Sequence, residues 1–439
     1  HVRLTDLKTA AALMPSVRQL PKSRRLSLAL GHHRAADFHW AEVVVQNPAV
    51  PRESPWLSVA RLSGARIENE ATLFFHLVGR QRIIGVTGTR GKSTTASLTA
   101  ALVRRRFPDT VLAGNISTTP MFAVLDRVRN SRGPVVLELS SWQLENLGAQ
   151  RMSPRIAVVT NVLPDHRNRY RRHASYVTAK WQIMAHQQPG DIAVLNADDP
   201  TTRAFGAAAR GVVVWFGRRS SSRRPRLTVV GGSLEWVGDR TERIGAVAAR
   251  RLRGEHNLAN IMAAAAVAKV CAVPSAAIRA VLAAFPGLPY RQEIVAVRGG
   301  VTYVNDTTAT TPEATIAAVR TFRGLGRGRR LVLIAGGSDK GLPDASFQAF
   351  ARQVRPAVKA VVLLTGEGSD RIVAALRRAR FRAPFVDDVP TMAHAVGLAQ
   401  AFATRGDTVL LSPACASFGL FVHAFDRGNQ FNRCVKALG

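Results

Sequence analysis

The chain has 439 residues, of which 46% are hydrophobic and 21% are charged, and this balance is typical of a globular protein with two or three domains. No apolar run approaches the roughly 18 residues that a membrane-spanning helix needs, so insertion into a membrane is not expected. The 61 basic and 29 acidic residues give a net charge of +32 at pH 7. The arginines are dispersed and few aromatic side chains lie among them, so a specific nucleic-acid partner is not expected either.

The three cysteines, Cys271, Cys415 and Cys434, form no CxxC pair and have no neighbouring histidine cluster. Neither a disulfide framework nor a structural zinc site is indicated, which favours a reducing compartment and a cytoplasmic protein. Residues 1–6 have the pattern of an apolar strand in the middle of a domain, and we expect the natural N-terminus to be missing.

Short apolar strands alternate along the chain with helical stretches rich in alanine and leucine, which predicts parallel α/β sheets. In chain order the predicted strands are 83–87, 135–139, 156–161, 192–196, 331–335, 360–365 and 408–412. The Ala-rich run 261–273 predicts a buried helix. The polar, basic segment 217–226 predicts a surface loop, and the Pro/Gly-rich segment 285–289 predicts a domain boundary.

A loop that binds nucleotide phosphates is predicted directly after the first of these strands. Its residues are Gly88, Thr89, Arg90, Gly91, Lys92, Ser93 and Thr94, and a helical stretch follows. Glycines let backbone N–H groups close around phosphates, Lys92 supplies a positive charge, and Ser93 can ligate magnesium. The strict GxxxxGK[ST] spacing is not met, because Val86 occupies the first glycine position. The loop alone leaves a motor, a GTPase, a kinase and a ligase open.

The order of further motifs resembles that of the Mur ligases and of the similar folylpolyglutamate synthetases. After GTRGKS (88–93) come LELSSWQLE (137–145), DHRNRY (165–170), NADD (196–199), GEHNLAN (254–260), GLPYR (287–291), GGSDKG (336–341) and LSPACAS (411–417). The resemblance covers essentially the whole chain. The segment 137–145 is similar to that of the Mur ligases that add glutamate, and it disfavours a folylpolyglutamate synthetase.

The resemblance implies three α/β domains. Residues 1–75 would form a truncated Rossmann-like domain that binds a UDP-linked substrate. Residues 76–287 would form a central P-loop ATPase domain with a mostly parallel sheet, and residues 288–439 a Rossmann-like domain that binds an amino acid. The first strand and the Gly-rich turn that would bind the UDP pyrophosphate are absent, in keeping with a missing start.

The resemblance also implies an ATP–magnesium site, whose catalytic residues would be Lys92, Glu138, His166 and Lys180. Two Mg²⁺ ions would be held by Ser93, Glu138, His166 and Lys180. Lys180 would serve as a carbamate formed with CO2, because an unmodified ammonium would repel the metal; an ordinary lysine on a helix surface is the alternative. Further ATP contacts are expected from Asn257 and Asn260, on adenine, and from Arg291 and Asp306, on the γ-phosphate and ribose.

Two substrate sites follow from the same resemblance. UDP-N-acetylmuramoyl-L-alanine would be contacted by Asp6, Asn47, Asn115, Ser140 and Gln143, and glutamate by Thr308, Thr310, Ser417 and Phe425. Thr308 stands where the family has a lysine that contacts the glutamate carboxylate, so a positive charge is missing from this pocket. D-glutamate is expected, and L-glutamate stays open as the alternative. Tyr290 replaces the family's histidine, and nothing in the sequence explains it.

These residues predict a monomeric, ATP-dependent acid–amino-acid ligase of peptidoglycan synthesis, hence of cell-wall biogenesis, cell shape and cell division. A substrate carboxylate would be phosphorylated to an acyl phosphate, which the amine of glutamate then attacks. From a different class, a P-loop ATPase stimulated by nucleic acid would account for the net charge of +32. A third reading is a catalytically inactive protein that only binds nucleotide.

Overall fold

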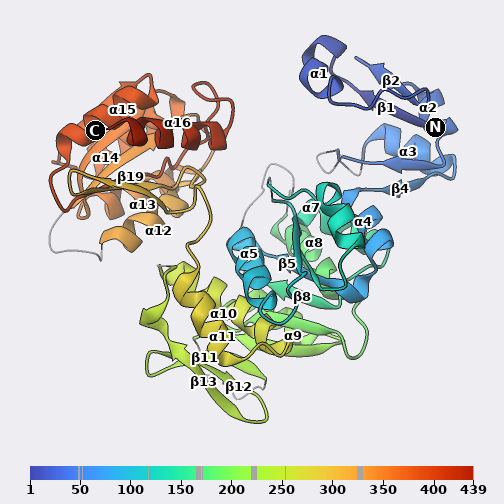
Figure 1. Ribbon diagram of the computed structural model, residues 1–439. Coiled ribbons are helices and arrows are strands. Elements are labelled where there is room, and N and C mark those ends of the chain that lie inside the picture. Colours follow the sequence, from blue (N-terminus) through green and yellow to red (C-terminus); the bar gives the residue numbers. More distant parts are fainter. Residues whose placement is uncertain are drawn as a thin grey trace. The chain divides into compact units, whose positions relative to one another are not determined.

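The computed structural model describes the chain except for residues 48, 49, 52, 117, 165–169, 171, 219–224, 253, 324–329 and 439. The fold has two compact units. The first comprises His1–Thr228, Trp236–Glu242 and Ala263–Val273, and the second comprises Val229–Glu235, Arg243–Met262 and Pro274–Gly439. Both contain parallel strands joined by helices, so the predicted α/β class is confirmed (Figure 1). The predicted limits of three domains stay predictions.

The N-terminal part of the first unit is built from two small parallel sheets. Strand β1 (Val2–Asp6) pairs with β2 (Leu26–Leu30), and β3 (Val43–Val45) pairs with β4 (Arg66–Glu68). The connecting helices are α1 (Ala10–Val17), α2 (Ala35–Trp40) and α3 (Pro55–Leu62). Their small core contains Phe38, Ala60 and Ala65. The strand expected at the start of the chain is therefore present as β1.

A nine-stranded sheet has the order β13-β12-β11-β10-β9-β8-β5-β7-β6. The bounds are β5 Ile83–Thr87, β6 Val111–Gly114, β7 Val135–Glu138, β8 Ile156–Val159, β9 Ile192–Asn196, β10 Val212–Phe216, β11 Arg226–Val230, β12 Ser233–Val237 and β13 Thr241–Ala246. The pairs from β11 to β6 are parallel. The predicted strands 83–87 and 192–196 are confirmed at both ends, whereas β7 and β8 end before residues 139 and 161.

Helices cover both faces of this sheet. They are α4 (Glu70–Val78), α5 (Lys92–Val103), α6 (Leu125–Arg129), α7 (Ser141–Ala149), α8 (His173–Ala185) and α9 (Pro200–Ala207), with short 3-10 turns at Arg80–Arg82, Phe122–Val124 and Val247–Ala249. Side chains of α4, α7 and α8 share one core cluster with β7. Helix α5 packs against β5, β6 and β7, and its buried Leu98 and Leu102 lie outside that cluster.

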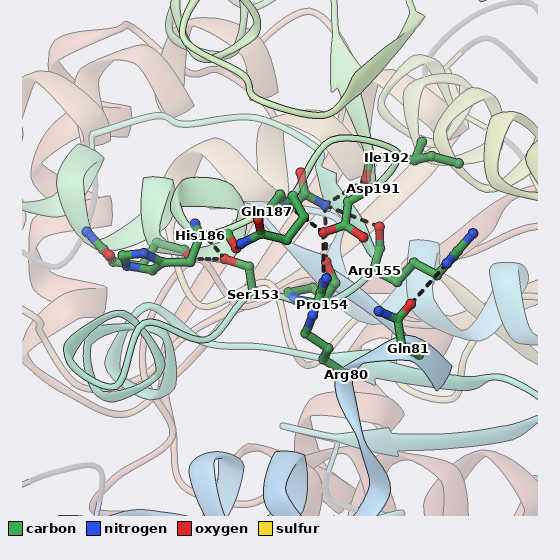
Figure 2. Close-up of polar contacts among 11 residues, drawn as sticks. Arg80, Gln81, Ser153, Pro154, Arg155, His186, Gln187, Asp191 and Ile192 are labelled. Carbon is green, nitrogen blue, oxygen red and sulfur yellow. Dashed lines mark hydrogen bonds and ion pairs between the residues drawn. The ribbon is translucent and has the colours of Figure 1, made fainter.

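Polar side chains close the amino ends of β5, β8 and β9 (Figure 2). Arg80 Nη1 lies 2.7 Å from Asp191 Oδ2. The amide nitrogen of Gln187 donates to the carbonyl oxygens of Pro154, Arg155 and Ile192 at 3.1, 3.3 and 3.0 Å. Because Arg80, Arg155 and Asp191 stand just before these strands, the contacts fix how the three strand starts lie together.

The second unit contains a six-stranded sheet of order β14-β15-β19-β16-β17-β18. The bounds are β14 Glu293–Arg298, β15 Val301–Asn305, β16 Leu331–Gly336, β17 Val358–Leu364, β18 Phe385–Val389 and β19 Thr408–Leu411. Only β14 is antiparallel to its neighbour among these pairs of the described chain. The predicted strands 331–335, 360–365 and 408–412 correspond to β16, β17 and β19, although β17 begins earlier, at Val358.

Helices cover both faces of this sheet as well (Figure 1). Helices α12 (Pro312–Arg323), α13 (Asp344–Val354) and α14 (Glu367–Arg378) supply Phe322, Phe350 and Ile372 to one core cluster. Helices α15 (Met392–Phe402) and α16 (Ala424–Ala437) supply Val396 and Phe431 to the other. A sheet covered on both faces explains why its strands read as continuous apolar runs.

The remaining helices are α10 (Glu255–Val270) and α11 (Ser275–Ala284). The predicted buried helix is confirmed, since every residue from Ile261 to Ala268 is at most 1% exposed. The predicted boundary at 285–289 falls between α11 and β14, outside any helix or strand. Most of the predicted loop 217–226 lies outside the described residues. All three cysteines are free thiols, and no helix of the described chain is long and apolar enough to cross a membrane.

Candidate active site

The predicted phosphate loop joins β5 to α5 in the first unit. Gly88 has a φ of +148°, and a Cβ at this position would lie 1.9 Å from Thr160 Oγ1, so only glycine fits. The loop is anchored to Asn161, whose backbone oxygen accepts from Thr89 N and whose side-chain oxygen accepts from Arg90 N, both at 2.9 Å. Lys92 Nζ donates to the carbonyl oxygens of Gly88 and Thr89, at 3.1 Å each. The lysine therefore lies over the loop that it is expected to serve.

The start of α5 suits an anion. Gly91 occupies the N-cap with a φ of +83° and a ψ of −2°, a left-handed conformation that favours glycine. Because glycine has no side chain, no N-cap oxygen competes for the N–H groups of the first helical turn. These groups and the helix dipole attract phosphate oxygens. Thr94, also predicted here, lies buried in the same turn.

Glu138, the last residue of β7, carries a buried carboxylate that is only partly satisfied. It lies opposite Val86 of β5 in the strand register and is 2% exposed. Asn115 Nδ2 donates to Glu138 Oε1 at 3.4 Å, and Oε2 has no hydrogen-bond partner among the described residues. Gly114 lets the two strands approach, because a Cβ there would lie 2.2 Å from the Glu138 carbonyl oxygen. A buried oxygen in this state is costly unless a cation binds it, so the site fits a magnesium ion.

Lys180 of α8 points at the carboxyl end of β5. It is 1% exposed, which excludes an ordinary lysine on a helix surface. Its Nζ donates to Thr87 Oγ1 at 3.0 Å and lies 5.3 Å from the centre of the Tyr176 ring. Tyr176 OH is in turn 3.1 Å from Thr89 Oγ1 of the phosphate loop. Two of the predicted catalytic residues, Lys92 and Lys180, are thereby tied to the same loop.

The predicted metal site is only partly described. Glu138, Lys180 and Ser93 are placed, whereas His166 lies outside the described residues. The placed part of the chain holds no group of three or more His, Cys, Asp or Glu side chains arranged to bind a metal. The predicted set combines one carboxylate with a hydroxyl, a histidine and a modified lysine, so it is not a group of that kind.

The predicted UDP-substrate residues have varied surroundings. Asp6 Oδ1 accepts from Lys8 N at 2.8 Å, Asn47 is exposed, and Asn115 contacts Glu138. Ser140 and Gln143 form a capping box at the start of α7, with Ser140 N donating to Gln143 Oε1 at 2.9 Å. Gln143 Nε2 also donates to Glu70 Oε1. Ser140 and Gln143 thus have a structural task that the sequence pattern S-x-x-Q could have revealed.

In the second unit, the predicted adenine residues Asn257 and Asn260 are buried on α10, where Asn260 Nδ2 donates to Asn257 Oδ1 at 3.0 Å. Asp306 follows β15 and accepts from Ser412 Oγ at 2.9 Å and from Gln292 N at 3.2 Å. Burial raises the pKa of Asp306 to about 7, although these hydrogen bonds and the charge of Arg291 act in the opposite direction.

Of the predicted glutamate residues, Thr308, Thr310 and Ser417 lie on loops, and Phe425 lies in the first turn of α16. Thr308 Oγ1 donates to the carbonyl oxygen of Tyr290 at 3.0 Å, and the Tyr290 ring packs 5.5 Å from that of Phe425. Thr310 Oγ1 accepts from Lys340 Nζ at 2.8 Å, and Ser417 is buried.

Two positively charged residues near these loops, Lys340 and Arg427, were not predicted as site residues from the sequence. Lys340 lies in the GGSDKG motif that the resemblance includes, so a signal existed. Arg427 of α16 is completely buried and donates to the backbone next to Thr308 and next to Ser417, two of the predicted glutamate residues. No sequence pattern distinguishes Arg427 from the exposed arginines.

The chain matches two protein families in succession. Residues 86–268 match the Mur ligase middle domain, and residues 290–415 match the Mur ligase, glutamate ligase domain. The UDP-N-acetylmuramoylalanine–D-glutamate ligase of Roseiflexus sp. is 43% identical over 99% of this chain and 93% of its own length. The ligase of that name from Symbiobacterium thermophilum is 40% identical over 90% of this chain and 84% of its own.

Solved structures agree on the fold. The UDP-N-acetylmuramate–alanine ligase of Thermotoga maritima superposes with a TM-score of 0.63 at 18% identity, over 99% of each chain. At this identity the likeness concerns the fold alone. The extent of identity with the Roseiflexus ligase, together with the two matching domains, establishes that the chain belongs to the Mur ligase family.

Proposed function

We propose that this chain is an ATP-dependent ligase that joins D-glutamate to UDP-N-acetylmuramoyl-L-alanine during the synthesis of peptidoglycan precursors. The relatives at 43% and 40% identity carry this activity in their names. The structural observation that carries the proposal is the carboxyl edge of the central sheet. There the glycine loop follows β5, Glu138 with its unpartnered Oε2 ends the adjoining β7, and the buried Lys180 of α8 donates to Thr87 at the end of β5.

The phosphate loop and the start of α5 bind the phosphates of ATP, with Lys92 adding a positive charge. Glu138 and Ser93, with His166 from outside the described residues, are the residues that would hold magnesium. When bound, magnesium offsets the negative charge of the phosphates. Adenine contacts are assigned to Asn257 and Asn260 of the second unit.

The reaction has two steps. An oxygen of the L-alanyl carboxylate attacks the γ-phosphorus of ATP, and the bond between that phosphorus and ADP breaks to leave an acyl phosphate. The unprotonated amine of glutamate then attacks the acyl carbon. The bond to phosphate breaks, the amine loses a proton, and the amide and inorganic phosphate are formed. Holding both substrates together favours the second step over hydrolysis.

Lys180 is proposed to act as a carbamate made with CO2. Its near-complete burial supports this role, because a buried ammonium close to a magnesium site would oppose the metal, whereas a carbamate would help to bind it. Lys180 Nζ donates to Thr87 Oγ1 at 3.0 Å, and the N–H group that a carbamate keeps on this nitrogen would make the same hydrogen bond.

Binding of glutamate is assigned to Thr308, Thr310, Ser417 and Phe425. The charge that is missing at Thr308 is offset by Lys340, which contacts the neighbouring Thr310. We therefore propose D-glutamate over L-glutamate. A cytoplasmic, monomeric enzyme is part of the same proposal.

The test is phosphate release by the full chain with ATP, magnesium and UDP-N-acetylmuramoyl-L-alanine. D-glutamate, L-glutamate and duplex DNA are added in separate reactions. The proposal predicts release that depends on D-glutamate and is at least about tenfold slower with L-glutamate. Release driven by DNA without an amino acid would instead identify a nucleic-acid-dependent ATPase. The absence of any release that depends on an amino acid contradicts the ligase.

A further inference from the structure

Arg427 of α16 is a fully buried arginine whose partners are all neutral. Its relative exposure is 0%. Nε donates to Thr307 Oγ1 at 3.0 Å and Nη2 to the Thr307 carbonyl at 2.9 Å, while Nη1 donates to the carbonyls of Cys415 and Ala416 at 3.3 and 3.1 Å. None of the ion pairs found in the described residues includes Arg427. Burying a cation without an acidic partner costs folding free energy, so the charge of Arg427 points to a function.

The partners of Arg427 lie on two loops at the carboxyl edge of the six-stranded sheet. Thr307 follows β15 and directly precedes Thr308. Cys415 and Ala416 follow β19 and directly precede Ser417. The guanidinium therefore fixes the backbone next to two of the residues assigned to glutamate.

Further contacts join these loops to the rest of the predicted pocket. Ala414 N donates to the carbonyl of Ala309 at 2.9 Å, and Ala416 forms a bridge with Ser338 of the GGSDKG motif. Phe425 stands in the first turn of α16, the helix that carries Arg427. Arg427 thus connects every segment that supplies a predicted glutamate contact.

Lysine could not make the same set of contacts. The planar guanidinium directs five N–H groups along fixed directions, and here they span two loops at once. An ammonium has three donors at one point and would reach fewer of these oxygens. The pKa of Arg427 is lowered by burial to about 10, so the side chain still carries its charge at neutral pH. In a low-dielectric interior, that charge attracts anions over several ångströms.

We infer that Arg427 is a positioning residue that sets the affinity for glutamate, both by holding the Thr307 and Cys415–Ala416 loops together and by placing an uncompensated positive charge behind them. Glutamate carries two carboxylates, so its binding profits from this charge more than the binding of a neutral amino acid would. The charge also compensates for the lysine that Thr308 replaces. This inference rests on the proposed function, because the pocket is the one assigned to glutamate.

The experiment compares Arg427→Met and Arg427→Lys with the wild type, in the full chain. The matched control is Arg82→Lys in the first unit. Arg82 likewise donates to three backbone carbonyls, those of Val128, Ser131 and Gly133, but far along the sequence from this pocket. KM values for D-glutamate, ATP and UDP-N-acetylmuramoyl-L-alanine are measured together with kcat and the melting temperature.

Arg427→Met is expected to raise the KM for D-glutamate by about 30-fold or more and the KM for ATP by less than about twofold. Arg427→Lys keeps the charge and is expected to raise the KM for D-glutamate by about three- to tenfold. Arg82→Lys is expected to lower the melting temperature without a selective change in any KM. The selectivity for glutamate is what a purely structural role would not produce.

Equal increases of all three KM values, or a lower melting temperature with unchanged KM values, would overturn the inference. If Arg427→Met does not fold, the test rests on Arg427→Lys alone. An unchanged KM for D-glutamate in Arg427→Lys would then contradict the inference. Failure of the proposed function is visible separately, as a wild type without glutamate-dependent turnover. In that event the rise in melting temperature that D-glutamate causes in the wild type is compared with that in Arg427→Lys, and an equal rise, or none in either protein, contradicts the inference.

Discussion

The two ends of the parallel strands differ in how their charges are satisfied. Two ion pairs lie at the amino ends. Arg80 binds Asp191 in the first unit, and Lys359 Nζ lies 2.8 Å from Asp407 Oδ2 in the second. At the carboxyl ends, Glu138 has an oxygen without a described partner and Arg427 has only neutral partners. Ligands of open α/β sheets bind at the carboxyl ends of the strands. Charged side chains without a charged partner at these ends are therefore available to interact with a ligand.

The acids of the second unit show the same contrast. Burial acts to raise the pKa of Asp407, but hydrogen bonds from Lys359 and Thr404 hold it below its usual value. Asp306, at the opposite end of the neighbouring strand β15, has a pKa raised to about 7 by burial. The charge of Asp407 therefore contributes stability, whereas burial destabilises the charged carboxylate of Asp306 at the edge where ligands are expected.

The largest expected effect is on turnover in Glu138→Gln. The variant removes the carboxylate proposed to hold magnesium, so phosphate release is expected to fall by about 1000-fold. Stability is expected not to fall, because an unsatisfied buried charge is replaced by a neutral amide. Steady-state kinetics and thermal melting measure the two effects.

Glu68→Gln is the matched control for this prediction. Glu68 is also 2% exposed, but its Oε2 accepts from Gln150 Nε2 at 2.8 Å. This variant is expected to melt at a lower temperature and to keep its turnover. A reversed outcome, with Glu138→Gln active and unstable, would show that Glu138 is a structural residue.

Lys180→Ala is expected to lower turnover by about 100-fold or more, since the proposed carbamate is lost. Acetate, as a small carboxylate, is expected to restore part of the activity, and sodium chloride at the same concentration is not. Kinetics with each salt measure the rescue. Unchanged activity in Lys180→Ala would remove this residue from the site.

Asp306→Asn is expected to change how the stability of the protein depends on pH. The folded-state pKa of Asp306, about 7, lies above the ordinary aspartate value of 3.8. The folded state therefore holds the proton more tightly, and wild-type stability declines as pH rises through this interval. The free energy of unfolding of Asp306→Asn, relative to that of the wild type, is expected to increase by about 2–3 kcal/mol from pH 5 to pH 8. Urea unfolding at both pH values measures the gain. A pH-independent difference would contradict the raised pKa.

The smallest effect is expected at the amino ends. Arg80→Met leaves Asp191 without its cation and is expected to cost about 1–2 kcal/mol of stability, a modest figure because the arginine is partly exposed. Turnover and every KM are expected to stay within about twofold of the wild type. Arg105→Met, at an exposed arginine, serves as the control. A selective loss of ATP affinity in Arg80→Met would contradict the division between the two ends.

The sequence predicted the parts of the fold that depend on local pattern. Apolar runs located β5 and β9 at both ends, and the glycines of 88–93 located the phosphate loop, because their conformations allow few other residues. The alanine run located the buried α10.

Contacts between distant segments could not be predicted in this way. The burial of Lys180 depends on packing of α8 against the end of β5, and that of Arg427 on the convergence of two loops. The pKa of Asp306 follows from burial that no local pattern encodes. By contrast, the spacing of Ser140 and Gln143 is that of a capping box, so their capping role could have been predicted from the sequence. The resemblance led us to assign both residues to the substrate alone.

The most direct test of the proposed ligase activity is to identify the reaction product. ATP, magnesium, UDP-N-acetylmuramoyl-L-alanine and D-glutamate are incubated with the full chain, and the nucleotide-sugar product is identified by mass spectrometry. We expect the product to contain one added glutamate, with loss of one water, and we expect one ADP and one phosphate to be formed for each product. Hydrolysis of ATP without this product would contradict the proposed activity.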